Sequence, residues 1–234
     1  MPWPQLGFRQ IRHGLDRFEG ITETAVVKNP PNASNPSEKA LLRRSLLAAR
    51  RALPAEALAG SARALSRSAL GLPELAGART VAAYVSIGSE PGTRDLLDAL
   101  RAAGKRVLLP VLLPDNDLDW AVYEGPGSLA ESVRPGFMAL LEPVGPRLGP
   151  EAVTGADAVL LPGLAVDRRG MRLGRGGGSY DRVLARLERA GADPALVVLL
   201  YDDEVVAWVP EEPHDHPVQA VATPSGVVRF TASA

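Results

Sequence analysis

The chain has 234 residues, 46% of them hydrophobic, so it can bury the core of one large α/β domain or of two small ones. A formal net charge of −1 argues against a nucleic-acid surface, and no apolar run approaches the ~20 residues of a membrane span. The lack of cysteine excludes disulfides and thiolate metal ligands, and we expect a cytoplasmic monomer whose partners are small molecules, not nucleic acids or membranes.

The first part of the chain, residues 1–36, ends in a turn-forming stretch without apolar periodicity, so we predict a flexible N-terminal extension there. The remaining residues, 37–234, are predicted to form a single catalytic domain. This domain opens with two amphipathic helices, one capped by Ser37 and one that follows Pro54.

The pattern then alternates between strands and helices. Two helices are predicted over residues 93–100 and 179–190, which Gly104 and Gly191 end. Strands are predicted over residues 81–87, 107–109, 118–123, 158–161, 196–200, 218–222 and 227–230. This order indicates a three-layer α/β fold, with a mostly parallel sheet between helices on both faces. Such a sheet binds ligands at the carboxyl ends of its strands.

The most informative segment runs from Arg172 to Arg182 and contains four glycines, three arginines and one aspartate. Glycines let backbone N–H groups point at phosphate oxygens, and the predicted helix that follows adds the positive end of its dipole. Arginine binds phosphate in a fork, and Asp181 is a hard oxygen ligand of the kind that Mg²⁺ prefers. The composition also suits a mobile turn with solvated arginines. It matches neither a Walker A loop nor a dinucleotide fingerprint.

Other candidate groups are open to two interpretations each. Lys39 and Arg43 share one helix face, where they could bind phosphates or simply be solvated. Glu90 follows a predicted strand and could meet a ligand donor or belong to a helix start. Asp167 could order the glycine loop or reach a metal ion, and the segment 214–216 (His-Asp-His) could bind a metal or form a polar turn.

Taken in order, these segments resemble the 5-formyltetrahydrofolate cyclo-ligase family, also called methenyltetrahydrofolate synthetase. The resemblance runs from about Glu38 to the last strand and is carried by Lys39-x-x-x-Arg43, Glu90-x-x-Thr93, Glu142-Pro143, Leu161-Pro162-Gly163-Leu164-Ala165-x-Asp167, Arg172-Leu173-Gly174-x-Gly176-x-Gly178-x-Tyr180-Asp181-Arg182, Pro210 and His214-Asp215. It implies cyclisation of 5-formyltetrahydrofolate to 5,10-methenyltetrahydrofolate with ATP as co-substrate and Mg²⁺ as cofactor. It also implies a fold similar to that of sugar-phosphate isomerases and CoA-transferases.

The resemblance further implies roles for individual residues. Catalysis is assigned to Arg172, Arg175 and Tyr180, and the metal ion to Asp181. ATP binding is assigned to Lys39, Arg43, Arg172, Leu173, Gly174, Arg175, Gly176, Gly177, Gly178, Ser179 and Tyr180. Substrate binding is assigned to Val85, Glu90, Trp120 and Met138. Two positions depart from the family's pattern, because Ser179 stands where many members have tyrosine and Met138 stands where an aromatic residue is common.

Two other functions stay open from the sequence. A sugar-phosphate isomerase of similar fold would need an anion loop and a proton-abstracting carboxylate, for which Asp167 is the nearby candidate. A non-catalytic folate or nucleotide binder would keep the loop without turnover. The pair Lys39 and Arg43 favours a polyphosphate ligand and so the ATP-dependent reaction.

Overall fold

The computed structural model describes residues 36–133, 139–213 and 215–230. Contacts group the chain from Ala33 to Ala234 into one compact unit. Of the predicted N-terminal extension, only Pro36 belongs to the described residues, and it begins the helix α1 (Pro36–Ala52). No helix within the described ranges is long and apolar enough to cross a lipid bilayer.

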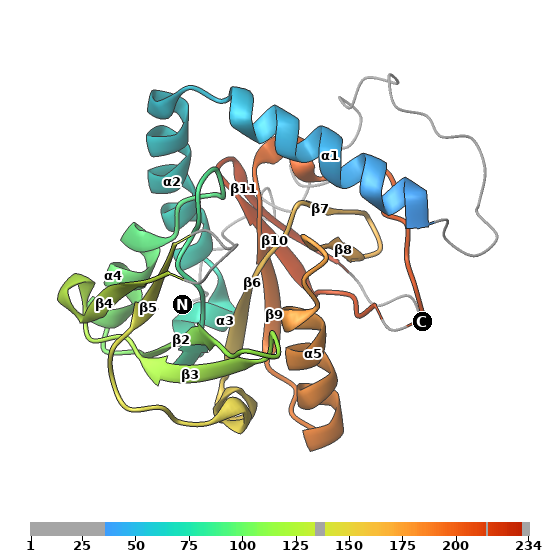
Figure 1. Cartoon of the computed structure of the whole chain (residues 1–234). Helices are drawn as coiled ribbons and strands as arrows, with labels where there is room; N and C mark the ends of the chain where they lie inside the picture. The colour runs from blue at the N-terminus through green and yellow to red at the C-terminus, as the bar shows by residue number, and fades with distance from the viewer. Residues whose placement is uncertain (1–35, 134–138, 214, 231–234) are drawn as a thin grey trace, which may run out of the picture. The chain divides into compact units, whose positions relative to one another are not determined.

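Seven strands form the central sheet, in the order β11-β10-β9-β6-β1-β2-β3 (Figure 1). They are β1 (Thr80–Ala82), β2 (Arg106–Leu112), β3 (Leu118–Val122), β6 (Ala158–Pro162), β9 (Ala195–Leu199), β10 (Ala220–Thr223) and β11 (Gly226–Arg229). The inner strands all pair in parallel, and only the two edge strands β3 and β11 pair antiparallel. The carboxyl ends of the parallel strands therefore meet at one edge of the sheet.

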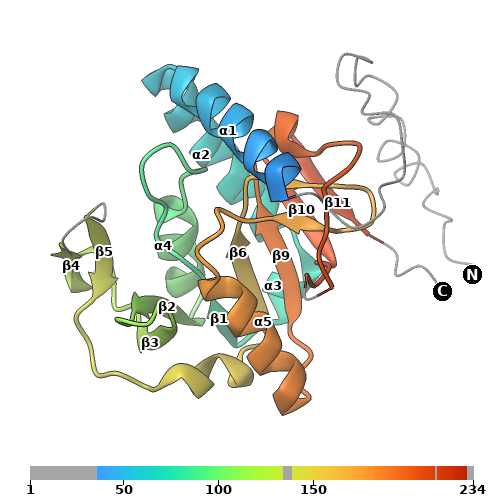
Figure 2. The same ribbon diagram turned by 45° about the vertical axis from the view of Figure 1, so that its right-hand side comes forward.

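Helices cover both faces of this sheet (Figures 1 and 2). One face packs against α2 (Ala55–Leu70), α3 (Pro73–Gly77) and α4 (Arg94–Ala102), and the other against α5 (Ser179–Ala190) and the 3₁₀ segment η3 (Pro150–Gly155). Strand β6 shows why: Ala158 and Leu160 point into the first core, whereas Val159 and Leu161 point into the second. The prediction of an α/β fold with a mostly parallel sheet between helices is confirmed.

Two short hairpins stand outside the sheet and were absent from the sequence pattern. One joins β4 (Leu129–Ser132) to β5 (Leu140–Pro143), and the other joins β7 (Ala165–Val166) to β8 (Arg172–Leu173). The first is tied to the sheet by the carboxylate of Glu142, whose Oε1 accepts the N–H of Leu112 at 2.8 Å. The second hairpin is followed directly by the glycine loop, which leads to the start of α5. The remaining 3₁₀ segments are η2 (Pro126–Ser128) and η4 (Asp202–Glu204).

The predicted strand over residues 81–87 is wrong beyond Ala82, where β1 ends. Ala83 still donates its N–H to the carbonyl of Leu108 at 2.9 Å. From Tyr84 onward a side chain replaces the strand partner, because the hydroxyl of Thr93 donates to the carbonyl of Tyr84 at 2.8 Å and accepts the N–H of Ser86 at 2.9 Å. The start of α4 thus shapes the segment that follows β1, and this segment carries the next charged residue, Glu90.

Helix α1 lies over the β7–β8 hairpin and is fixed by polar and apolar contacts. Its Leu42 and Leu46 pack against a small core that contains Leu173. Its Arg50 is 2% exposed and donates to both carboxylate oxygens of Glu204, at 2.6 and 2.8 Å. Apolar contacts thus hold the middle of α1 against the hairpin, and Arg50 holds its C-terminal end against η4.

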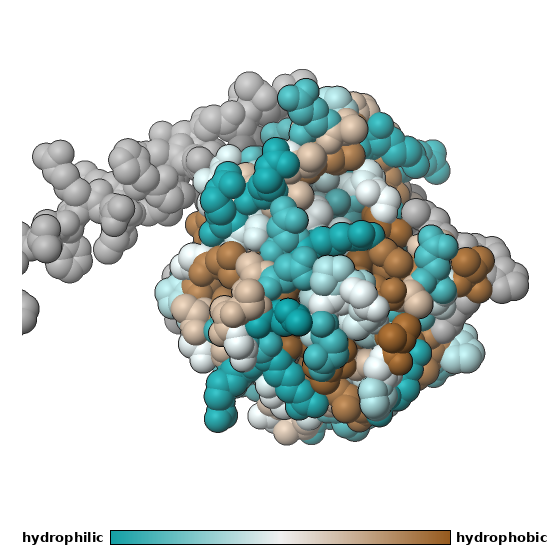
Figure 3. Space-filling view, turned by 90° about the vertical axis from the view of Figure 1, so that its left-hand side faces the viewer, coloured by the Kyte–Doolittle hydropathy of each residue, from teal (hydrophilic) through white to brown (hydrophobic). Residues whose placement is uncertain are grey.

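The face beside α4 and the β4–β5 hairpin is shown in Figure 3. Hydrophilic side chains cross its centre, and the hydrophobic ones form separate groups. Val133 and Val144, which flank the hairpin, are 71% and 65% exposed. Within the described part of this face, no broad continuous apolar area is visible.

Candidate active site

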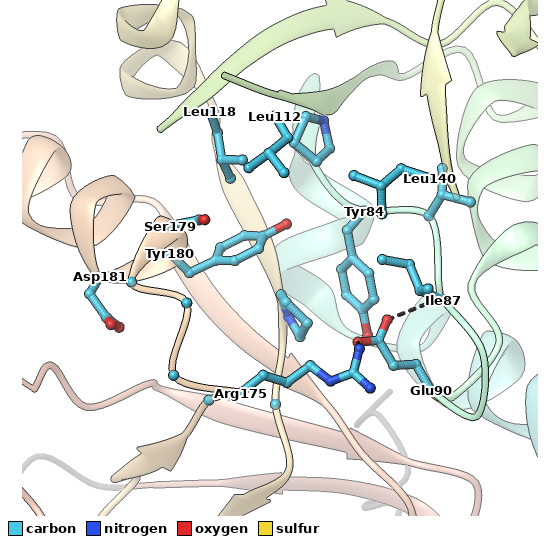
Figure 4. Close-up of a pocket in the computed structure, with 18 of the residues that line it drawn as sticks. Tyr84, Ile87, Glu90, Leu112, Leu118, Leu140, Arg175, Ser179, Tyr180 and Asp181 are labelled. Carbon is cyan, nitrogen blue, oxygen red and sulfur yellow. Dashed lines mark hydrogen bonds and ion pairs between the residues drawn. The ribbon is translucent and has the colours of Figure 1, made fainter. Parts of the chain in front are cut away.

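A cavity of about 250 Å³ opens at the carboxyl ends of β1, β2 and β6 (Figure 4). Its walls come from segments that are far apart in the sequence: Tyr84, Val85, Ile87, Glu90, Pro110, Leu112, Leu118, Leu140, Leu141, Glu142, Pro162, Gly163, Arg172, Gly174, Arg175, Gly176, Gly177, Gly178, Ser179, Tyr180 and Asp181. This is the edge at which parallel α/β sheets bind ligands.

One half of the cavity is apolar and aromatic. Aliphatic side chains, among them Leu112, Leu118 and Leu140, form its wall, and the rings of Tyr84 and Tyr180 project into it from opposite sides. Both phenol hydroxyls are buried and have no hydrogen-bond partner among the described residues. Burial and the charge of Glu90 raise the pKa of both phenols, so both keep their protons. This half suits a flat heterocycle that supplies its own polar atoms.

A buried carboxylate, Glu90, lies at the edge of this apolar half. It is 8% exposed, its Oε2 accepts the N–H of Ile87 at 2.9 Å, and Nη1 of Arg175 lies 3.4 Å from its Oε1. Burial raises the pKa of Glu90, an effect that the Ile87 N–H and the Arg175 guanidinium partly offset. Glu90 is therefore placed to accept hydrogen bonds from N–H groups of a ligand.

The other half of the cavity is the glycine loop and the start of α5. Gly178 is the N-cap residue with φ 76°, and no side chain caps the helix there. The N–H groups of the first turn thus have no partner in the helix and can bind an anion. A Cβ at Gly174 would lie 2.9 Å from Nη1 of Arg172, so the guanidinium would have to shift to make room for it. The loop can therefore hold a guanidinium and an anion side by side.

Arg172 and Asp181 form the charged floor of this half. The side chain of Arg172 is 6% exposed, and its Nη2 lies 3.1 Å from Oδ1 of Asp181, whose own side chain is 41% exposed. Burial lowers the pKa of Arg172, while the carboxylates of Asp181 and Asp215 act in the opposite direction. A buried guanidinium with its Nε unpartnered among the described residues can take a further anionic partner.

The rim beside this floor comes from α1. Arg43 donates from its Nε to the carbonyl of Gly174 at 2.9 Å. Lys39 is 5% exposed, and its ammonium lies 2.7 Å from both Glu212 and Asp215. Arg43 is therefore next to the glycine loop, Lys39 lies one turn away on the same helix, and neither lines the cavity.

Comparison with known proteins identifies the family. The sequence model of the 5-formyltetrahydrofolate cyclo-ligase family matches residues 35–224. The chain belongs to this family. It is 43% identical over 200 residues to the 5-formyltetrahydrofolate cyclo-ligase of Mycolicibacterium smegmatis, covering 83% of this chain and 98% of that protein. It is 36% identical over 160 residues to the enzyme of Escherichia coli, covering 66% and 83%.

A solved structure is similar as well. The NMR structure of 5,10-methenyltetrahydrofolate synthetase from Aquifex aeolicus superposes with a TM-score of 0.68 at 28% identity, covering 84% of this chain and 94% of that one. The predictions of the family and of an enzyme of this ligase class are confirmed. Of the residues to which the resemblance gives roles, those that line the cavity are Val85, Glu90, Arg172, Gly174, Arg175, Gly176, Gly177, Gly178, Ser179, Tyr180 and Asp181.

Besides Lys39 and Arg43, two described residues to which the resemblance gives a role have side chains away from the cavity. Trp120 is completely buried in the core beneath α5 and does not line the cavity. It shares a face of β3 with Leu118, which does line the cavity, but its place on β3 is two residues further from the carboxyl end of β2. Leu173 is 1% exposed and packs under α1, because successive residues of β8 point to opposite sides and Arg172 takes the cavity side. Met138 lies outside the described residues.

Asp167, for which the sequence left two interpretations, is fully buried, and both of its carboxylate oxygens accept hydrogen bonds from the protein. Its carboxylate accepts the N–H groups of Arg169, Met171 and Val209, and it pairs with the guanidinium of Arg169. It therefore orders the turn before the glycine loop and has no room for a metal ion. His214, the other open position, lies outside the described residues.

Sequence reasoning missed Tyr84 and gave no role to Glu142, both of which line the cavity. Tyr84 stands in the apolar run Val81-Ala82-Ala83-Tyr84-Val85, and nothing in that run shows where the strand ends and the cavity begins. Glu142 could have been suspected from its place in the Glu-Pro motif, because a carboxylate inside an apolar hairpin needs a partner. Its partner is the N–H of Leu112.

The donor set of the cyclo-ligase cavity can also be tested against Mg²⁺. The described residues contain no group of three histidine, aspartate or glutamate side chains that could enclose a metal ion. Mg²⁺ commonly uses one or two carboxylates together with substrate phosphates and water. Asp181, half-exposed at the start of α5 beside Arg172, fits that second mode of binding.

Proposed function

We propose that this chain catalyses the ATP-dependent cyclisation of 5-formyltetrahydrofolate to 5,10-methenyltetrahydrofolate, with ADP and phosphate as products. The observation that carries the proposal is that one cavity joins an apolar half containing buried Glu90 to a glycine loop containing buried Arg172. The membership of the family and the names of its relatives support the same reaction.

The chemistry explains why both halves are needed. The formyl oxygen attacks the γ-phosphorus of ATP while the bond to ADP breaks, which turns a poor leaving group into a phosphate ester. N10 then attacks the formyl carbon, the carbon–oxygen bond breaks, phosphate leaves and N10 loses its proton. Phosphoryl transfer requires little covalent work from side chains, so the protein acts by positioning and charge neutralisation.

The phosphates of ATP bind at the glycine loop. The N–H groups at the start of α5 and the guanidinium of Arg172 receive the γ-phosphate, since they surround one end of the cavity. Arg43 extends this positive region beyond the cavity, whereas the ammonium of Lys39 is paired with Glu212 and Asp215. Charge neutralisation of the transferred group by such fixed donors lowers the barrier.

The metal ion would neutralise further phosphate charge and orient the γ-phosphate, and Asp181 would hold it. Asp181 sits in the first turn of α5 and has 41% of its side chain exposed, so it can exchange its contact with Arg172 for a metal ion. The carboxylate of Asp215 also raises the pKa of Arg172, after that of Asp181.

The reduced pterin binds in the apolar half. Glu90 accepts its N–H groups, and the rings of Tyr84 and Tyr180 together with Val85 bound its faces. Tyr180 alone supplies the aromatic ring at the loop, because Ser179 replaces the tyrosine that many relatives carry before it. The formyl group is thereby directed toward the glycine loop.

The structure weakens one alternative. A sugar-phosphate isomerase would use Asp167 as its base, but that carboxylate is fully buried and occupied by four donor groups of the protein. A binder without turnover would have the same cavity, so kinetics must separate it from the enzyme. Three further predictions belong to this proposal. They are a fold similar to that of sugar-phosphate isomerases and CoA-transferases, a monomeric state and a cytoplasmic location.

The deciding experiment follows the absorbance of methenyltetrahydrofolate after mixing the protein with 5-formyltetrahydrofolate. We expect product only when both ATP and Mg²⁺ are present, and none after EDTA. Folded protein that binds both ligands without forming product would establish the binder instead.

A further inference from the structure

Among the described residues that line the cavity, Tyr84 is the one aromatic residue to which the resemblance gives no role. Its side chain is 4% exposed, and its hydroxyl is buried without a hydrogen-bond partner in the described part of the chain. Buried hydroxyls in proteins are nearly always satisfied, so an unpartnered one in the wall of a cavity indicates a ligand atom as its partner.

The hydroxyl of Tyr84 lies beside the carboxylate of Glu90. Figure 4 shows the Tyr84 ring running toward Glu90, with the guanidinium of Arg175 next to both groups. Glu90 is acceptor-only when ionised, whereas burial raises the pKa of Tyr84 well above its ordinary value and so keeps it a donor. An acceptor and a donor therefore stand side by side at one edge of the cavity.

A 2-amino-4-oxopyrimidine edge has the complementary pattern. Its 2-amino group and N3–H are donors, and the neighbouring O4 is an acceptor. We propose that Glu90 and Tyr84 together recognise this edge, with Glu90 accepting from the amino group and N3–H and Tyr84 donating to O4. Tyr84 is thus a residue that determines specificity for the 4-oxo form of the pterin, an inference that rests on the proposed function.

Binding in this way displaces Arg175. Its guanidinium is 3.4 Å from Glu90 and occupies the place that the pyrimidine edge would take. The side chain of Arg175 is 41% exposed and belongs to the glycine loop, so it can leave without disturbing the core. Once released, it is available to the phosphates of ATP, which links binding of the two substrates.

The test compares wild type with Tyr84→Phe. Binding of 5-formyltetrahydrofolate and of its 4-amino-4-deoxy analogue, in which NH₂ replaces O4, is measured by fluorescence titration. We expect the variant to bind the 4-oxo compound about 3- to 10-fold more weakly and the 4-amino compound within about twofold of wild type, as the loss of one hydrogen bond requires. Tyr123→Phe is the matched control, since its hydroxyl donates to Asp98 at 2.7 Å away from the cavity.

The thermal midpoint of unfolding separates recognition from a structural role. The Tyr84 hydroxyl has no described partner in the free protein, so Tyr84→Phe should unfold at the same temperature as wild type or higher. An unchanged ratio of the two affinities, equal weakening of both compounds, or a lowered midpoint would overturn the inference. Wild-type turnover is measured in parallel, so that failure of the proposed function appears as absent product whatever the ratio shows.

Discussion

At the scale of single residues, the site depends on charges that are buried with few partners. Glu90 is held by one backbone N–H and one arginine, and burial keeps its pKa above its ordinary value of 4.5. Such a group is costly for the fold when it is ionised and useful for a ligand with N–H donors. The ionisation of Glu90 should therefore change both the activity of the protein and its free energy of unfolding.

We predict opposite effects of Glu90 on folding and on binding as pH rises. The folded protein binds the proton of the Glu90 carboxyl more tightly than the unfolded chain does. Protonated Glu90 therefore stabilises the fold fully below pH 4.5, and this contribution to the free energy of unfolding is lost as pH rises through the raised pKa. Glu90→Gln should gain stability relative to wild type across that window, measured by urea unfolding at a series of pH values. The KM of wild type for the folate should fall across the same window. A flat difference in stability would contradict the raised pKa.

A second prediction concerns Asp181, whose contact with Arg172 and whose proposed contact with Mg²⁺ have different consequences. Asp181→Asn should lower kcat by roughly 100-fold or more through loss of the metal contact, since electrostatic groups at a reacting phosphate have effects of this size. Its thermal midpoint should change little, because the amide oxygen of asparagine can still accept a hydrogen bond from the buried guanidinium of Arg172. Titration of kcat against Mg²⁺ tests this, with the exposed Asp193→Asn as control. A variant with the Mg²⁺ dependence of wild type would exclude Asp181 as the ligand.

At the scale of elements, the sequence predicts the parts whose ends carry local signals. The helix over residues 179–190 was predicted with its observed bounds, because Gly191 adopts φ 62° and ends it. The strand after Thr80 was predicted too long, since the contacts of Thr93 that end it are made by a later residue. The β7–β8 hairpin gave no signal, because each of its strands has only two residues.

The glycine loop provides a matched pair of substitutions. Gly177 and Gly178 both have open space where a Cβ would stand, but only Gly178 has a positive φ, of 76°. Gly178→Ala should therefore cost roughly 1 kcal/mol of stability and raise the KM for ATP, because the start of α5 must move. Gly177→Ala should leave both quantities nearly unchanged. Denaturant unfolding and initial rates at varied ATP test this, and equal effects of the two substitutions would show that the left-handed backbone is not what matters.

At the scale of the whole molecule, the cavity is assembled from segments spread between Tyr84 and Asp181. The sequence could assign Arg172 and Glu90 to the site because their motifs are local. It could not exclude Trp120 or find Tyr84, because the distance to which the cavity extends along each strand is set by packing between the layers. The position of a residue in the fold thus decides whether it lines the cavity, where its motif and the composition around it do not.

The last prediction concerns the N-terminal segment, because every described cavity residue and the rim on α1 lie after it. The compact unit begins at Ala33 and the match to the family at residue 35. A chain that starts at Ala33 should therefore fold and retain kcat and both KM values within roughly twofold of the full chain. A chain that starts at Leu53 is the control, and it should lose activity because it lacks Lys39, Arg43 and Arg50. Steady-state kinetics and thermal unfolding of the three proteins test this. A large loss of activity in the first truncation, with its folding intact, would show that residues 1–32 take part in catalysis.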